Sequence, residues 1–155
     1  MIKQRVFAAG LIVLLVAAAS VASAQTRLLF GAWTLNASKS NLGGPPPKEQ
    51  GVTFEASGAD GIFAIEDTVY AGGKRTTIRY TAKIDGKDYA IVGSREVLDR
   101  ADTVSLTRVN ATTITWTYKK AGKVILSVPG VLSPDGKTLI MTTADRRTLV
   151  YEKQH

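Results

Sequence analysis

The chain has 155 residues, a formal net charge of +7 and no cysteine. The absence of cysteine excludes disulfides and thiolate metal sites, so the fold depends on packing alone. The one histidine, His155, is the last residue, so neither a Ser-His-Asp nor a Cys-His arrangement has an internal base. The modest positive charge fits either an anionic partner or simple solubility.

The N-terminal segment has the three parts of a secretory signal peptide. Lys3 and Arg5 form a basic start, residues 6–19 form an apolar run, and residues 22–24 read Ala-Ser-Ala in front of Gln25. Small residues at these positions are what a signal peptidase requires. The pattern predicts cleavage after residue 24.

An uncleaved membrane anchor is the alternative interpretation of this segment. The apolar run is shorter than the roughly 20 residues that span a bilayer, and no cysteine follows it that could carry a lipid anchor. We therefore expect residues 1–24 to be a cleaved signal peptide and residues 25–155 to be a single domain, exported to the periplasm or outside the cell. No membrane span is expected after cleavage.

The first predicted strand, residues 30–35, is followed by an irregular stretch over residues 36–50. This stretch contains Gly43-Gly44 and then three consecutive prolines at positions 45–47. Consecutive prolines favour polyproline II and are incompatible with regular helix or interior strand. We expect a surface loop or lid here.

From residue 52 onward, short β-rich runs alternate with turns that contain Gly, Asn, Asp or Pro. Residues 93–102 show no clear strand pattern and are compatible with a helical turn. With residues 30–35, the expected strands number about ten; the others are residues 52–57, 62–70, 75–84, 88–92, 103–109, 112–119, 123–132, 138–144 and 148–153.

Alternation of apolar and polar residues is clearest in two of these strands. Between positions 78 and 84 every even position is apolar, and between positions 113 and 119 Ile114, Trp116 and Tyr118 alternate with Thr or Lys. This period of two predicts a sheet with one wet face. About ten such strands in succession predict an all-β fold, a single up-and-down antiparallel barrel that removes exposed edges. A two-sheet β-sandwich is the alternative.

Two short motifs carry a resemblance to the lipocalin and fatty-acid-binding superfamily. A G-x-W motif on the first strand is typical of that superfamily, and the run Gly31-Ala32-Trp33-Thr34-Leu35 resembles it. The closing strand of intracellular fatty-acid-binding proteins is similar to Val150-Tyr151-Glu152-Lys153. Residues 30–153 as a whole resemble small secreted bacterial proteins with a lipocalin-like domain. The resemblance implies a barrel whose interior holds one small apolar ligand.

The chain departs from the fatty-acid-binding pattern in two places. Leu149 stands where those proteins have an arginine, two residues before the position of Tyr151, and Arg146 and Arg147 do not match it. Residues 36–50 are too short and too rich in proline to form the two-helix lid. The resemblance therefore does not imply that this chain binds a fatty-acid carboxylate through an arginine and a tyrosine, as those proteins do.

The candidate ligand-binding residues are aromatic side chains on expected inner faces, together with one arginine. Arg108 lies on the same face of its strand as Val104 and Leu106. If this apolar face points into the barrel, the Arg108 guanidinium points inward as well, where it would bind an anion. The alternative for Arg108 is a position at the rim of the barrel, where its charge reaches water. The alternative for the aromatic side chains is that they only fill the core. The candidates are Trp33, Tyr80, Arg108, Trp116, Tyr118 and Tyr151.

The acidic residues do not form a recognisable catalytic or metal-binding pattern. Glu66 and Asp67 are adjacent, so on a strand they point to opposite faces and cannot act as a pair. We interpret these acids, and Glu96 with Asp99, as solvated surface groups. The turn aspartates do not match the spacing of a calcium loop. No catalytic residue, metal site or cofactor is predicted.

We therefore expect a non-enzymatic exported barrel that binds a small apolar or anionic amphiphilic ligand. The alternative is a structural or protein-interaction module of the cell envelope, with a filled core and no ligand. A nucleic-acid partner is not expected, because the basic groups at the turns lack interleaved aromatics and a reader helix. The two functions differ in the interior, which is open in a carrier and densely packed in a module.

Overall fold

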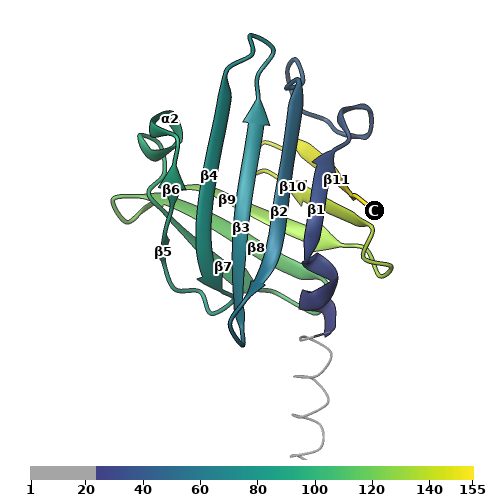
Figure 1. The fold of residues 1–155 in the computed structure, drawn as a ribbon, viewed down its shortest axis with the longest axis vertical. Coiled ribbons are helices and arrows are strands. Elements are labelled where there is room, and N and C mark those ends of the chain that lie inside the picture. The colour runs from purple at the N-terminus through teal and green to yellow at the C-terminus, as the bar shows by residue number, and fades with distance from the viewer. Residues whose placement is uncertain (1–23) are drawn as a thin grey trace, which may run out of the picture.

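Eleven strands form one antiparallel sheet within residues 24–155, the part of the chain that the computed structural model describes (Figure 1). The predicted signal peptide lies outside the described residues, except for its last position. The strands are β1 (Gly31–Leu35), β2 (Glu49–Ser57), β3 (Gly61–Val69), β4 (Arg75–Lys83), β5 (Tyr89–Ala90), β6 (Val92–Gly93), β7 (Thr103–Arg108), β8 (Thr113–Lys120), β9 (Lys123–Leu132), β10 (Thr138–Thr142) and β11 (Thr148–Lys153).

The strand order is that of an up-and-down barrel. It runs β5-β7-β8-β9-β10-β11-β1-β2-β3-β4-β6, so nearly every strand pairs with its neighbours in sequence, and β1 pairs with β11. The inner faces are those that the alternation predicts: Tyr80 and Ala82 of β4 and Ile114 and Trp116 of β8 are buried. The predicted all-β up-and-down barrel is confirmed, and the two-sheet alternative is not what the chain forms.

A short stretch of chain between β4 and β7 nearly closes the barrel. β5 pairs with β7 and β6 pairs with β4, so consecutive residues bridge the two flanking strands. Between them, Ile91 donates its backbone N–H to the carbonyl oxygen of Asp102 at 2.9 Å, and its side chain is buried. The single strand predicted over residues 88–92 is thus divided between two partners.

Gly93 makes this closure possible on the β4 side. A Cβ atom at this position would lie 2.1 Å from the carbonyl oxygen of Thr77, well inside contact distance. The adjacent Ser94 donates its backbone N–H to the same oxygen at 2.8 Å. Any larger residue at position 93 would push β6 away from β4.

The irregular segments also follow the sequence pattern. The loop after β1 holds only a single 3-10 turn, η1 (Ala37–Lys39), and β2 begins at Glu49 after the prolines. The expected helical turn is α2 (Arg95–Leu98). No helix in the described part of the chain is both long and apolar enough to cross a membrane.

Helical residues 24–29 lie at the foot of β1 and cover one end of the barrel (Figure 1). Leu29 is 1% exposed, and its carbonyl oxygen accepts a hydrogen bond from Nε1 of Trp33 at 2.8 Å. Nζ of Lys153 lies 4.9 Å from the centre of the Trp33 ring. Trp33 is therefore a core residue that fixes this end of the barrel.

Candidate ligand-binding cavity

A cavity of about 390 Å³ occupies the half of the barrel away from helical residues 24–29. It reaches Gln50 and Thr68, which pair at one end of the β2–β3 hairpin, whereas the turn of that hairpin lies at the other end. Its walls are mainly apolar side chains from strands all round the barrel, among them Val52, Phe54, Ile78, Trp116, Val128 and Leu149.

The buried part of the cavity and its rim differ in character. Phe54 and Trp116 are almost fully buried, and their ring centroids lie 6.0 Å apart. Ile125 and Leu126, on β9, line the same cavity but are 50% and 38% exposed. An apolar path therefore leads from solvent at β9 to the barrel interior.

One carboxyl group, that of Glu66 on β3, lines this cavity. Its Oε1 atom accepts a hydrogen bond from Oη of Tyr118 at 2.7 Å and another from Oη of Tyr80 at 3.1 Å. The Tyr80 hydroxyl in turn accepts from Nε1 of Trp116 at 3.1 Å. Three aromatic side chains from β4 and β8 thus hold one carboxyl oxygen of β3 in place.

Burial sets the protonation of this group. It raises the pKa of Glu66 above its ordinary value, and hydrogen bonds from Tyr118 and Tyr80 offset only part of that effect. Burial, reinforced by the charge of Glu66, raises the pKa of Tyr80 and of Tyr118 well above the usual tyrosine value. Both phenols are therefore protonated hydrogen-bond donors at neutral pH.

No cation neutralises Glu66 within the described residues, where the ion pairs all involve other acids. The two arginines that line the cavity, Arg100 and Arg147, are exposed at the rim. Nε of Arg147 forms an ion pair with Asp145 at 2.8 Å. The cavity therefore combines a cationic rim with an interior carboxyl group.

Three of the six predicted site residues line this cavity: Trp116, Tyr118 and Tyr151. The hydroxyl of Tyr151 accepts a hydrogen bond from Nε2 of Gln50 at 2.8 Å, and burial raises the Tyr151 pKa. Tyr80 is buried behind the lining and reaches the site through Glu66. Trp33 lies at the closed end, away from the cavity.

The structure does not bring Arg108 to this cavity. Its strand parity is as expected, because Val104 and Leu106 are fully buried, but Arg108 is the last residue of β7. Its Nη2 donates to Oγ1 of Thr26 and its Nη1 to the carbonyl oxygen of Ala111 at 3.2 Å. The guanidinium thus ties the end of β7 to helical residues 24–29.

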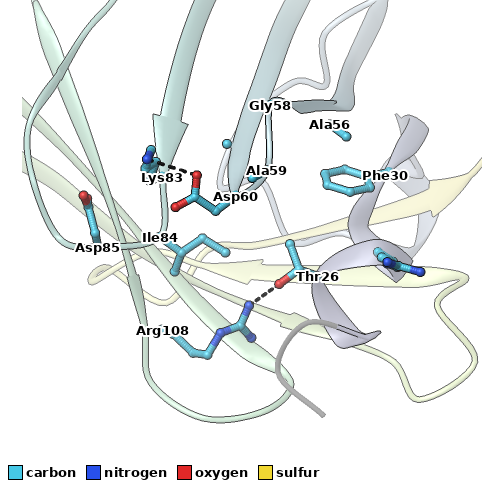
Figure 2. Close-up of a pocket in the computed structure, with 12 residues that line it drawn as sticks. Thr26, Phe30, Ala56, Gly58, Ala59, Asp60, Lys83, Ile84, Asp85 and Arg108 are labelled. Atoms are coloured by element: carbon cyan, nitrogen blue, oxygen red, sulfur yellow. Dashed lines mark hydrogen bonds and ion pairs between the residues drawn. The ribbon is translucent and has the colours of Figure 1, made fainter. Parts of the chain in front are cut away.

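Arg108 lines a second hollow, of about 570 Å³, at this opposite end of the barrel (Figure 2). Figure 2 shows Arg108 joined to Thr26, and Lys83 joined to Asp60 by an ion pair of 3.0 Å. The charged side chains Lys83, Asp60 and Asp85 are exposed. The lining of this hollow mixes charged side chains with apolar ones, whereas small-molecule sites are mostly apolar with a few polar groups.

Glu66 corrects the interpretation of the acids as solvated surface groups. It shares strand parity with Ile62 and Ala64, both fully buried, so its carboxyl points into the barrel. The sequence held one usable signal: adjacent Glu66 and Asp67 must point to opposite faces, so one of them had to be internal. The alternation did not show which, because Phe63 and Ile65 make the outer face of β3 apolar as well.

The cavity does not bring together the groups of a metal centre. Across residues 24–155, no cluster of three or more His, Cys, Asp or Glu side chains is placed to hold a metal ion. The polar groups that the cavity does offer are a carboxyl, phenol and alcohol hydroxyls, one amide and two rim guanidinium groups. These are groups that orient a ligand by hydrogen bonds and charge.

Comparison with protein-family models and comparison with curated proteins each find no match for the chain. Among solved structures, the chain is similar to a redesigned β-barrel, with a TM-score of 0.44 and 17% sequence identity. The alignment covers 87% of this chain and 96% of that one. A likeness this distant gives no information on a ligand.

Proposed function

We propose that the chain is a binding protein, not an enzyme, that holds one small, largely apolar ligand inside its barrel. The observation that carries this proposal is the cavity of about 390 Å³ with its apolar walls and one internal carboxyl group. Ligand pockets typically have about 300–1,000 Å³, apolar walls and a few convergent polar groups. An envelope module with a filled core would instead pack its interior to crystal-like density.

A lipocalin-like assignment and an exported location belong to the same proposal. The support for the first is the up-and-down strand order together with the G-x-W tryptophan, Trp33, buried at the closed end. The support for the second is the signal-peptide pattern of residues 1–24. The barrel would then collect its ligand in the periplasm or outside the cell.

A ligand titration with a cavity-filling variant tests the binding function. Thr68 of β3 lines the cavity and is half-buried, so Thr68→Phe adds a ring to the space that the ligand needs. We expect the uncharged probe decanol to bind the wild type saturably, with a shift in tryptophan emission from Trp116, and to bind Thr68→Phe weakly or not at all. The control is Thr81→Phe, on the exposed outer face of β4, which should bind as the wild type does.

Two results would overturn the binding function. One is a wild type that binds no decanol below its solubility limit, and the other is decanol binding that Thr68→Phe leaves unchanged. Arg108→Leu extends the test to the other end of the barrel. Because Arg108 lies outside the cavity, its removal should leave decanol affinity unchanged.

A further inference from the structure

We propose that Glu66 anchors the ligand by pairing with a cationic nitrogen, so that the ligand is an amine with an apolar body. This inference rests on the proposed binding function and specifies the chemistry of the ligand's polar end. The ligand expected from the sequence was either apolar or an anionic amphiphile, and Arg108, the residue expected to meet an anionic head group, lies outside this cavity.

The first support is the unused hydrogen-bonding capacity of Glu66. An ionised carboxylate offers about four acceptor positions on two oxygens. The two phenol donors, Tyr80 and Tyr118, both go to Oε1. No described residue donates a hydrogen bond to Oε2, and the side chain lines the cavity. The remaining acceptor positions are therefore free for a donor on the ligand.

The second support is the charge balance inside the barrel. A carboxylate in an apolar cavity is costly unless it is paired, and two neutral phenol donors compensate only in part. Among the described residues that line the cavity, Glu66 is the only acid, and no cation forms an ion pair with it. A cationic nitrogen at Oε2 would complete the pair. A second carboxylate placed there would be repelled.

The third support is the way the phenols are fixed. The Tyr80 hydroxyl oxygen accepts a hydrogen bond from Nε1 of Trp116, and the hydroxyl donates its own proton to Glu66. Both phenols therefore act as donors toward the carboxyl and leave it an acceptor. Trp116 and Phe54 also form the apolar surface nearby, where the ligand's hydrocarbon part would lie. Anchor and apolar wall are thus built from the same residues.

A series of matched probes tests the inference: decylamine, decanol and decanoate share one ten-carbon chain and differ in head group. Each is titrated at neutral pH, below micelle formation, into the wild type, Glu66→Gln and Glu55→Gln. Glutamine keeps the size and an acceptor oxygen for the phenols but removes the charge. Glu55, exposed on the outer face of β2, supplies the same change of charge outside the cavity.

We expect the wild type and Glu55→Gln to bind decylamine about tenfold or more tightly than decanol, and decanoate more weakly than either. In Glu66→Gln the ratio of amine affinity to alcohol affinity should fall to about one, whereas Glu55→Gln should keep the wild-type ratio. Should this variant fail to fold, the order of the three probes on the wild type alone still decides the question.

The alternative outcomes separate this inference from the function on which it rests. Equal binding of all three probes by the wild type would overturn the amine anchor and leave the binding function standing. Tightest binding of decanoate, lost in Arg100→Gln, would also overturn it and place an anionic head at the rim. Failure of all three probes to bind would contradict the binding function itself.

Discussion

Glu66 is the residue at which stability and proposed function oppose each other. Its carboxyl lies among apolar walls and holds two phenols, yet no described cation neutralises it. Burial therefore raises its pKa, which means that the folded state disfavours the ionised form. An unliganded barrel should thus lose stability when this group ionises.

This opposition predicts how the stability difference between the wild type and Glu66→Gln depends on pH. A carboxyl whose pKa is raised by folding contributes most below the pKa of the unfolded chain, near 4.5, and loses that contribution as pH rises through the folded value. The variant has no such group. The free energy of unfolding of the wild type should therefore fall relative to that of Glu66→Gln as pH rises above about 4.5.

Urea denaturation of both proteins over a pH series measures this difference. The tyrosines around Glu66 do not interfere, because burial raises the pKa of Tyr80, Tyr118 and Tyr151 and all three stay protonated throughout. Other carboxyl groups contribute equally to both proteins. A wild type that gained stability over the variant with rising pH would show that Glu66 is held as a favoured carboxylate.

Trp116 carries a second prediction at the scale of single residues. It is 1% exposed and contacts both Phe54 and the Tyr80 hydroxyl. Trp116→Ala should cost about 3–5 kcal/mol, as expected for emptying a large aromatic site. Thr115→Ala, on the opposite face of β8, should cost less than about 0.5 kcal/mol. Chemical denaturation that ranked these two variants in the reverse order would contradict the inward orientation of Trp116.

The strands show which features a single sequence can predict. The observed bounds of β9 and β11 coincide with the expected ones, because Gly- and Pro-containing turns and apolar alternation mark both ends. The stretch over residues 88–92 was expected as one strand, and its division into β5 and β6 depends on partners distant in sequence. The inward carboxyl of β3 was missed because apolar residues occupy both of its faces.

The packing between β8 and β9 gives a prediction for one strand position. A Cβ atom at Gly130 of β9 would lie 2.7 Å from Cζ3 of Trp116 and 3.3 Å from Cδ1 of Leu139. Gly130→Ala should therefore displace the indole and cost about 1–3 kcal/mol. Gly72→Ala is the matched control, because a Cβ there meets no atom within 4 Å. Equal thermal stability of the two variants would show that the indole moves freely.

The properties of the whole molecule are the least visible in its sequence. Alternation and turn spacing predicted a barrel, but the open interior depends on how side chains from all strands fill a common volume. Whether an arginine reaches that interior depends on its height along the barrel as well as on its parity. Arg108 lies on the inner face of β7 but at the end of the barrel near helical residues 24–29. Glu66 lies in the half of the barrel that contains the cavity.

The central claim is that the open half of the barrel holds one ligand per chain. Native mass spectrometry of the protein with increasing decylamine counts bound molecules directly. We predict that one molecule binds each wild-type chain at saturation, and that Thr68→Phe stays unliganded under the same conditions. Adducts that grow in number without a one-to-one plateau, and to the same extent in both proteins, would contradict the claim.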